Sequence, residues 1–347
     1  MPRSIPARAA GVTRCSARSS PARKWSRPSR RSRPVTTNRW TPKTSRQGRG
    51  FAALIGWGQF FALGSALVWA LAIVLFRRAG DTLPAFEQNL FKNLLGFALL
   101  LPTLALFEGL HWPEYPLREV GIALLSGYLG IAVADTWYLR ALHLMGASRT
   151  GIVASLLSPF VILLSVLFLG ESLGPWQLLG FFLVMAGILL VTWKSKRRSV
   201  DSEHVRKGVL YGVGAMFLMA VGIVMVKEIL ETRSFLWTTE IRLAGGIAGM
   251  LIYVVLRRRV AEVRRRFTQN LPWKTIGLAS FLAAYVSMMM WLAGYKLIPA
   301  AEASILNESA NAWIVFLAWL MLGESIDRRK VFGLALTSVG VGVMLLV

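Results

Sequence analysis

The sequence contains a single cysteine, Cys15, and only three histidines in 347 residues. One cysteine forms neither an internal disulfide nor a thiolate metal cluster. His111, His143 and His204 are scattered along the chain, which argues against a histidine metal site. The chain also lacks a Walker loop, a dinucleotide-binding glycine loop, an HExxH motif and a nucleophile elbow. These absences predict no metal site, no cofactor and no catalytic residues, and we expect a protein that is not an enzyme.

Charged residues are scarce as well, at 16% of the chain against 55% hydrophobic residues, and the mean hydropathy is +0.53. A chain this apolar is not an ordinary soluble domain. The net charge of +23 is typical of nucleic-acid binding, but residues 1–50 hold 14 Lys and Arg and no acid, which leaves +9 for the remainder. Only Trp25 and Trp40 of this tail can stack on bases, and no RNA-binding motif is present. We therefore expect no nucleic-acid partner.

Residues 1–50 are rich in Arg, Ser and Pro and show no hydrophobic period. Such a segment cannot bury enough apolar area to offset its ordering entropy, which predicts disorder. It lacks the apolar core of a secretory signal, and its composition is similar to an organelle transit peptide, although its prolines disfavour an amphipathic helix. The other interpretation is an upstream sequence translated from the wrong start. We expect this tail to be absent from the mature protein.

Ten apolar runs of about twenty residues follow the tail, and a helix of that length crosses the hydrocarbon of a bilayer. No strand-like alternation appears, and a backbone in lipid must satisfy its own hydrogen bonds, so all ten are predicted to be helices. The predicted spans are Gly56–Phe76, Ala85–Phe107, Val120–Tyr138, Thr150–Leu169, Trp176–Trp193, Val209–Ile229, Leu236–Leu256, Ile276–Tyr295, Ala303–Leu322 and Val331–Val347.

The chain contains an internal duplication. A shift of 153 residues places Ala147–Val191 on Ala300–Met344 without a gap and with 11 identities in 45 positions. The triplet Gly170-Glu171-Ser172 then falls on Gly323-Glu324-Ser325, with an apolar run on either side of each. Chance does not readily produce this agreement, so we interpret each copy as a duplicated transmembrane hairpin.

A shift of 150 residues extends the duplication to the first two spans of each half, where Lys92 falls on Arg242. We therefore predict a five-helix repeat at 56–193, a linker at 194–207 and a second five-helix repeat at 208–347. Because five is odd, the second repeat enters the membrane from the opposite side to the first. This inverted repeat is the architecture of secondary transporters that work by alternating access.

A known family shares these features. They are Gly64-Ser65-Ala66-Leu67-Val68-Trp69, Ala141-Leu142, Ser158-Pro159-Phe160, Leu169-Gly170-Glu171-Ser172, Gly180 and Gly187, then Leu322-Gly323-Glu324-Ser325, Gly333 and Gly340. The pattern resembles the ten-helix members of the drug/metabolite transporter superfamily, specifically the EamA family, over roughly residues 56–347. The resemblance implies traffic of metabolites or drugs, commonly their export. The second half has Ala312 where the family pattern favours proline, so its substrate cannot be carried over from other members.

Lys92 and Arg242 are the first candidates for a substrate site, because charged side chains within a span are costly and mark function. Each is predicted about 10 Å into its helix. Related by an inverted two-fold, both reach a central cavity and hold a substrate carboxylate or phosphate there. The alternative is that each extends to its interface or pairs with a carboxylate such as Glu87 or Glu240.

Asp135 and Glu308 are the candidate proton-coupling carboxylates, because burial raises a carboxylate pKa toward the range in which protons exchange. Both are predicted about five residues from a span end, so the alternative is an interfacial carboxylate that stays ionised. Asn307 and Asn311 lie four residues apart on one helix face and are further substrate-binding candidates. Their alternative is hydrogen bonding between helices.

Glu171 and Glu324 each precede a predicted helix and are followed by Ser. We interpret both as structural, because helix capping and the helix dipole explain a carboxylate at this place.

We expect a multi-pass secondary transporter of small organic metabolites or drugs, with proton coupling and export as the favoured mode and exchange or facilitated passage open. Its expected partners are a small-molecule substrate and the lipid bilayer, its expected location is the plasma membrane of a prokaryote, and a homodimer is left open. The rival is a membrane enzyme or assembly partner, which an inverted repeat explains poorly.

The distribution of Lys and Arg predicts the orientation of the helical core. We number the connections between consecutive predicted spans along the chain and leave out the tail and the two cations within spans, Lys92 and Arg242. The odd-numbered connections then hold 20 Lys and Arg, and the even-numbered ones hold 4. Because cations near span ends mark the cytoplasmic side, the odd-numbered connections are expected in the cytoplasm and both ends of the core outside. The 14 cations of the tail and the family resemblance favour the reverse, which is why we expect the tail to be absent.

Overall fold

The computed structural model describes residues 56–109, 114–169, 175–192, 202–297 and 300–345. The basic tail, His111, the first Gly-Glu-Ser triplet with Glu171, and residues 194–201 of the predicted linker lie outside the described residues. The remainder of the linker belongs to the first turns of a helix that begins at Ser202. The division into two repeats and a linker stays a prediction.

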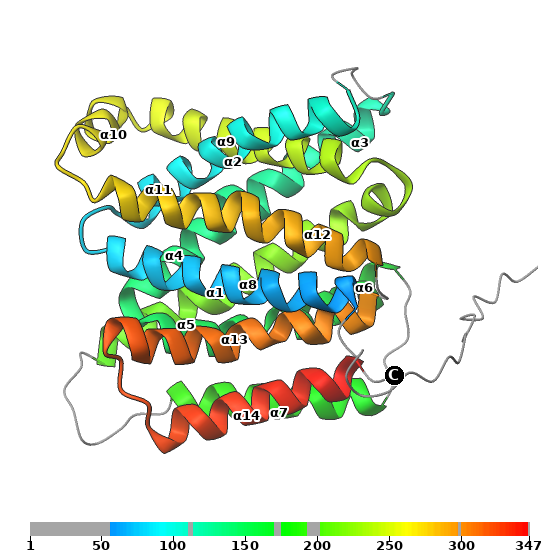
Figure 1. The fold of residues 1–347 in the computed structure, drawn as a ribbon, viewed down its shortest axis with the longest axis vertical. Helices are drawn as coiled ribbons and strands as arrows, with labels where there is room; N and C mark the ends of the chain where they lie inside the picture. Colours follow the sequence, from blue (N-terminus) through cyan, green and yellow to red (C-terminus); the bar gives the residue numbers. More distant parts are fainter. Residues whose placement is uncertain (1–55, 110–113, 170–174, 193–201, 298–299, 346–347) are drawn as a thin grey trace, which may run out of the picture. The chain divides into compact units, whose positions relative to one another are not determined.

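All regular secondary structure in the described ranges is helical (Figure 1). The first half contains α1 (Trp57–Ala79), α2 (Ala85–Phe107), α3 (Leu117–Gly127), the π-helical segment η2 (Tyr128–Ala134), α4 (Asp135–Met145), α5 (Ala147–Ala154), α6 (Leu157–Leu169) and α7 (Pro175–Thr192). The second half contains α8 (Ser202–Thr232), α9 (Phe235–Leu256), α10 (Val260–Phe267), α11 (Trp273–Phe281), the π-helical segment η3 (Leu282–Ser287), α12 (Met288–Leu297), α13 (Ala300–Leu322) and α14 (Arg328–Leu345).

Six helical stretches of the described chain are long and apolar enough to cross a membrane. They are Trp57–Ala79, Ala85–Phe107, Leu117–Met145, Glu203–Leu230, Phe235–Leu256 and Trp273–Gly294. Leu178–Leu190 within α7 and Leu306–Leu322 within α13 are apolar but shorter. The prediction of an all-helical fold with membrane-length helices is confirmed for the described residues, whereas the count of ten spans is not.

The predicted fourth span, Thr150–Leu169, is broken at Ser155 and Leu156 into α5 and α6. Pro159 explains the break, because it has no N–H to bond the Ser155 carbonyl oxygen and its ring clashes with that carbonyl. Its counterpart in the duplication is Ala312, which keeps its N–H, and α13 runs through it without interruption. The expectation of one continuous fourth helix is wrong for this local reason.

The predicted third and eighth spans are longer than expected. Val120–Tyr138 extends into the continuous helix α3–η2–α4, which ends at Met145, and Ile276–Tyr295 extends into α11–η3–α12. Each contains a π-helical segment, and the two segments lie at corresponding places in the duplication. Such segments are rare and are frequent at functional sites.

The helices α7 and α14 lie side by side (Figure 1). A methyl group at Gly187 would lie 2.7 Å from the carbonyl oxygen of Gly333, and one at Gly340 would lie 2.8 Å from that of Gly180. The shift that places Gly180 on Gly333 also places Gly187 on Gly340. The contact of Gly187 with Gly333 therefore corresponds to the contact of Gly340 with Gly180, as expected for two helices related by a two-fold axis.

Other contacts between the halves also occur in corresponding pairs. α1 packs against α13, and its counterpart α8 packs against α5 and α6. α3 and η2 pack against α9, while α11 and η3 pack against α2. The largest cluster of buried apolar side chains includes Phe76, Leu142 and Ile152 from the first half and Met216 and Ile314 from the second. The two halves therefore share one core.

Candidate functional site

Lys92 and Asp135 form an ion pair between α2 and α4. Lys92 lies in the second turn of α2, and Asp135 is the first residue of α4, directly after the π-helical segment η2. Their side chains are only 9% and 16% exposed. Because both side chains are largely removed from water, each charge depends on the other, and loss of one would leave the other buried and uncompensated.

Asn89, one turn before Lys92, fixes the place where the two helices meet. Its side-chain amide donates to the Ile131 carbonyl oxygen at 2.8 Å and to the Thr136 hydroxyl at 3.0 Å. Both acceptors lie within or directly beyond η2, where a π-helix leaves backbone carbonyls in altered positions. Asn93 donates in turn to the Asn89 side-chain oxygen at 3.1 Å. This buried amide pair holds α2 against η2 and so places Asp135 opposite Lys92.

Arg242 of α9 lies against the π-helical segment η2, which ends at the residue before Asp135. Its Nη2 is the nearest atom to a methyl group built at Gly130 of η2, at 3.6 Å. The Arg242 backbone also packs at the start of this segment, since a methyl group at Gly127, the residue before it, would lie 1.8 Å from the Arg242 carbonyl oxygen. The Arg242 Nε is buried and has no hydrogen-bond partner among the described residues. The structure therefore brings three of the predicted residues together: Lys92, Arg242 and Asp135.

The alternative partners predicted for Lys92 have other environments. Glu87 accepts a hydrogen bond from Arg259 at 3.3 Å. Glu240 is buried, and neither of its oxygens has a partner in the described chain. Lys92 pairs with Asp135 instead of either one. Asp135 also lies deeper than expected, because its helix continues from Asp135 to Met145 instead of ending at Tyr138.

Glu308 belongs to a second cluster, built from α13 and the break between α5 and α6. Ser158 donates to one oxygen of Glu308 at 2.9 Å, and the Asn311 amide donates to the other at 2.9 Å. Asn311 also donates to the Ser155 hydroxyl at 2.9 Å. Because Pro159 interrupts the helix at Ser155, both serines of the first half face the polar side chains of α13.

These four residues are related by the duplication. The shift that places Pro159 on Ala312 places Ser155 on Glu308 and Ser158 on Asn311. The bond from Ser158 to Glu308 therefore corresponds to the bond from Asn311 to Ser155, with the two halves exchanged. A pair of reciprocal hydrogen bonds of this kind is expected where two copies of one helix cross at a local two-fold axis.

Asn307 joins the same helix to α1. Its side-chain oxygen accepts from the Ser65 hydroxyl at 2.7 Å, and Ser287 of η3 donates to the Ser65 carbonyl oxygen at 3.2 Å. Asn307 and Asn311 thus make the interhelical hydrogen bonds expected under their alternative interpretation. Their role in binding substrate stays a prediction.

Sequence reasoning missed Asn89, Ser155 and Ser158 as members of these clusters. In the sequence, Ser158 stands out only as part of the motif Ser158-Pro159-Phe160. The signal that identifies both serines is the duplication, because it aligns each with a polar residue of the α13 group, Glu308 or Asn311. Nothing in the sequence near Asn89 indicates that it reaches the π-helical segment of another helix.

Glu324 caps a helix, but not the one that was expected. Its carboxylate accepts from the backbone N–H of Ala147 at 2.8 Å and from the Ser148 hydroxyl at 2.6 Å, at the start of α5. The helix that follows it, α14, receives its cap from Asp327, which accepts from the Lys330 N–H at 2.9 Å. Burial acts to raise the pKa of Glu324, but the bonds from Ser148 and Ala147 hold it below its usual value.

The model of the EamA-like transporter family matches residues 56–193 and 206–346. A WAT1-related protein of Arabidopsis thaliana is 22% identical over 314 residues, which cover 80% of this chain and 85% of that protein. The UDP-N-acetylglucosamine transporter of Mus musculus is 31% identical over 102 residues, which cover 26% of this chain and 31% of the transporter. A solved crystal structure has a similar fold, with a TM-score of 0.57 and 17% identity over 82% of this chain and 95% of that one.

Proposed function

Because the chain belongs to the EamA-like transporter family, within the drug/metabolite transporter superfamily, we propose that this membrane transporter is a secondary transporter working by alternating access. Its ten predicted spans form two inverted five-helix repeats. It moves a small anionic organic metabolite, with protons as the coupling ion and export as the direction.

The observation that carries this proposal is the ion pair of Lys92 with Asp135, beside Arg242, which lies against the neighbouring segment η2. Lys92 pairs with the one carboxylate of this cluster, and Arg242 adds a second cation beside it. Arg242 has a buried Nε donor with no partner in the described chain. A guanidinium and an ammonium together are suited to a carboxylate or phosphate group. The substrate's anionic group binds here and competes with Asp135 for Lys92.

The distant relative supports the same substrate class. The mouse protein that is 31% identical over 102 residues is a UDP-N-acetylglucosamine transporter, and such a substrate carries phosphate. The matched region is about a third of that transporter. We therefore propose the chemistry of an anionic organic solute and use UDP-N-acetylglucosamine as one probe of it.

Glu308 is the proposed proton carrier. Its two oxygens accept from Ser158 and Asn311, and among the described residues no cation pairs with it. A carboxylate held only by neutral donors is free to gain and lose a proton without breaking an ion pair. The reciprocal hydrogen bonds around it support an axis between the halves, about which the two access states exchange.

The test is transport into proteoliposomes under an imposed pH gradient, with a panel of labelled anionic metabolites that includes UDP-N-acetylglucosamine. Glu308→Gln is expected to lose gradient-driven accumulation and to keep counterflow exchange. Glu119→Gln is the matched control, because its carboxylate pairs with Arg233 away from both clusters. Unchanged accumulation in Glu308→Gln would show that protons do not travel through this residue.

The substrate site is tested separately. Lys92→Gln and Arg242→Gln are each expected to abolish both accumulation and counterflow while the protein still inserts and purifies as a single species. Normal counterflow in both variants would remove the two cations from the site, whatever the result at Glu308.

A further inference from the structure

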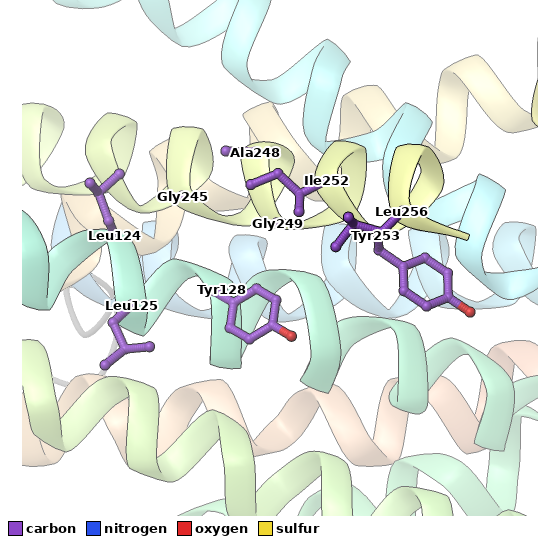
Figure 2. A pocket seen from close by; sticks show the side chains of 9 residues that line it. All are labelled: Leu124, Leu125, Tyr128, Gly245, Ala248, Gly249, Ile252, Tyr253 and Leu256. Atoms are coloured by element: carbon purple, nitrogen blue, oxygen red, sulfur yellow. The ribbon is translucent and has the colours of Figure 1, made fainter. Parts of the chain in front are cut away.

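An apolar groove runs between α9 on one side and α3 with η2 on the other (Figure 2). Its volume is about 460 Å³, and it is lined by leucine, isoleucine, tyrosine, alanine and glycine only. The walls are outward-facing, since Ile252 is 57% exposed and Leu256 is 76% exposed. None of the polar residues of the two clusters described above lines it. The groove therefore opens to the surroundings of the helical core and not to the proposed substrate site.

Two glycines of α9 form its floor. A methyl group at Gly245 would lie 2.3 Å from the Leu124 carbonyl oxygen, and one at Gly249 would lie 2.2 Å from the Tyr128 ring. The two helices are in contact at these glycines, and the larger side chains on either side form the walls of the groove. Because the lining is apolar and both helices are of membrane length, the groove faces hydrocarbon.

The length of the groove matches one leaflet. It extends along α9 from Gly245 to Leu256, which is about 16 Å at the rise of an α-helix. Half of a bilayer's hydrocarbon core is roughly 15 Å thick. The groove begins near mid-membrane and ends where the helix ends, so one extended acyl chain fits along it.

Arginines follow directly at the end of the groove. Arg257 and Arg258 come after Leu256, and both are exposed. The nearby Glu262 is engaged by Arg259, which donates to it at 2.8 Å and holds its pKa below the usual value. Among the described residues, no acid forms an ion pair with Arg257 or Arg258. Two unneutralised guanidinium groups therefore lie at the level of the lipid headgroups.

Arg258 occupies a position that normally favours glycine. Its φ is 53°, in the left-handed region, and its N–H donates to the Val255 carbonyl oxygen at 3.0 Å while the Arg259 N–H donates to that of Val254 at 2.9 Å. These bonds form the helix ending in which glycine is usual, because a side chain is strained there. An arginine at this place indicates a use for its side chain rather than for its backbone.

We propose that this groove and the arginines at its end bind one anionic phospholipid. One acyl chain lies in the groove between Gly245 and Leu256, and the phosphate binds Arg257 and Arg258. The charge at one end and the length of a single leaflet favour a lipid over a helix from a second copy, which would need a full-length apolar face. The predicted orientation places this end at the cytoplasmic leaflet, whose surface is anionic. This site is independent of the transport mechanism proposed above.

The experiment is native mass spectrometry of the full chain in neutral detergent, titrated with dioleoyl phosphatidylglycerol or dioleoyl phosphatidylcholine. The anionic lipid is expected to stay bound in one copy at concentrations where the zwitterionic lipid does not. Arg257→Gln combined with Arg258→Gln should weaken the phosphatidylglycerol affinity by roughly tenfold to thirtyfold. Arg328→Gln combined with Arg329→Gln removes equal charge elsewhere and should leave the affinity unchanged. An equal loss in both double variants would overturn the proposal, since it would indicate attraction to overall charge.

The acyl chain is tested with substitutions that fill the groove. Ala248→Phe is expected to remove most of the bound lipid, because Ala248 is exposed and lines the groove. Val255→Phe adds the same ring to an exposed position of α9 outside the lining and should retain it. Ile252→Trp provides a second blocking variant if Ala248→Phe fails to purify. Lipid that stays bound in the blocked variants would overturn the proposal in favour of binding at the headgroup alone. A dimer of the parent protein that these variants dissociate would overturn it in favour of a second copy in the groove.

Discussion

The two halves of the molecule share a helix pattern and differ at the positions that matter for chemistry. Both have a π-helical segment in the third helix and glycines where the fifth helices cross. The first half, however, breaks its fourth helix at Pro159, whereas the second half continues through Ala312. The duplicated backbone is therefore symmetric where helices pack and asymmetric where a helix can bend.

The acidic residues are divided between the halves in the same way. Asp135 of the first half corresponds to Met288 of the second, and Glu308 of the second corresponds to Ser155 of the first. Each half thus keeps one carboxylate that the other has replaced. Each copy has a cation at the same place, Lys92 in the first and Arg242 in the second; Lys92 pairs with Asp135, and Arg242 packs against the segment before it. The proposed cation site therefore draws on both halves, whereas its carboxylate comes from the first half and the proposed proton carrier from the second.

The largest effect that separates the halves is expected at Asp135. Asp135→Ala leaves Lys92 buried without its partner and should reduce the free energy of unfolding by about 3–5 kcal/mol. Met288→Leu, at the corresponding place in the second half, should cost less than about 1.5 kcal/mol. Both are measured by denaturant titration in mixed micelles with tryptophan fluorescence.

A rescue variant distinguishes loss of the pair from loss of packing. Lys92→Met combined with Asp135→Leu removes both charges of the pair and should recover part of the stability lost by Asp135→Ala, because Arg242 stays buried without a neighbouring carboxylate. Transport should be abolished in this variant, as in Lys92→Gln, because the ammonium group is gone. Equal stability of Asp135→Ala and Met288→Leu would contradict the assignment of a buried ion pair.

The next effect concerns the broken helix. Ala312→Pro places the same break in the second half and should reduce the free energy of unfolding by about 3 kcal/mol. The proline lacks the N–H that faces the backbone carbonyl oxygen of Glu308, and its ring clashes with that carbonyl group. Ala312 is exposed, so the effect acts through the backbone. Ala312→Ser keeps the N–H and serves as the control. Hydrogen exchange should accelerate in residues 303–311 of the proline variant only, and unchanged exchange would contradict the explanation given for the break at Pro159.

How far the sequence predicts this fold depends on how local the determining interaction is. Hydropathy over about twenty residues identified the membrane-length helices, because burial in lipid is a property of each segment alone. The break at Pro159 was also within reach, since a proline inside a helix acts on its own preceding turn. The π-helical segments were not, because no residue pattern in η2 or η3 distinguishes them from α-helix.

The candidate site shows the same limit. The duplication singles out Lys92 and Arg242, and the structure pairs Lys92 with Asp135 and places Arg242 against the segment before Asp135. That the carboxylate would be Asp135 depended on the helix running on to Met145, which the hydropathy boundary at Tyr138 concealed. Partners that depend on how two helices cross, such as Asn89 with Ile131, follow from packing and not from spacing.

The third effect concerns the reciprocal hydrogen bonds. Ser158→Ala removes a donor to the Glu308 carboxylate and should cost about 1.5–3 kcal/mol when Glu308 is ionised, since bonds to charged groups are stronger. Ser155→Ala removes a bond between neutral groups and should cost about 0.5–1.5 kcal/mol. Protonation of Glu308 makes both bonds neutral, so the difference should shrink as the pH falls. A difference that does not change with pH would mean that Glu308 keeps one protonation state, against its proposed role as proton carrier.

The smallest effect is expected at Glu324, a residue of the second half that caps α5 of the first. Glu324→Gln weakens the bonds to Ala147 and Ser148 and should cost about 1 kcal/mol at neutral pH. Because those bonds hold the pKa of Glu324 below its ordinary value of 4.5, folding favours the ionised form. The stability it contributes is therefore complete above 4.5 and is lost as the pH falls through the folded-state pKa. Unfolding titrations of the two proteins should converge in acid, whereas Glu203→Gln, which removes an exposed pair with Lys207, should match the parent throughout. Plots of unfolding free energy against pH that stay parallel into acid would show that Glu324 acts through its shape and not through its charge. The contact of Glu324 with the start of α5 would then be independent of pH.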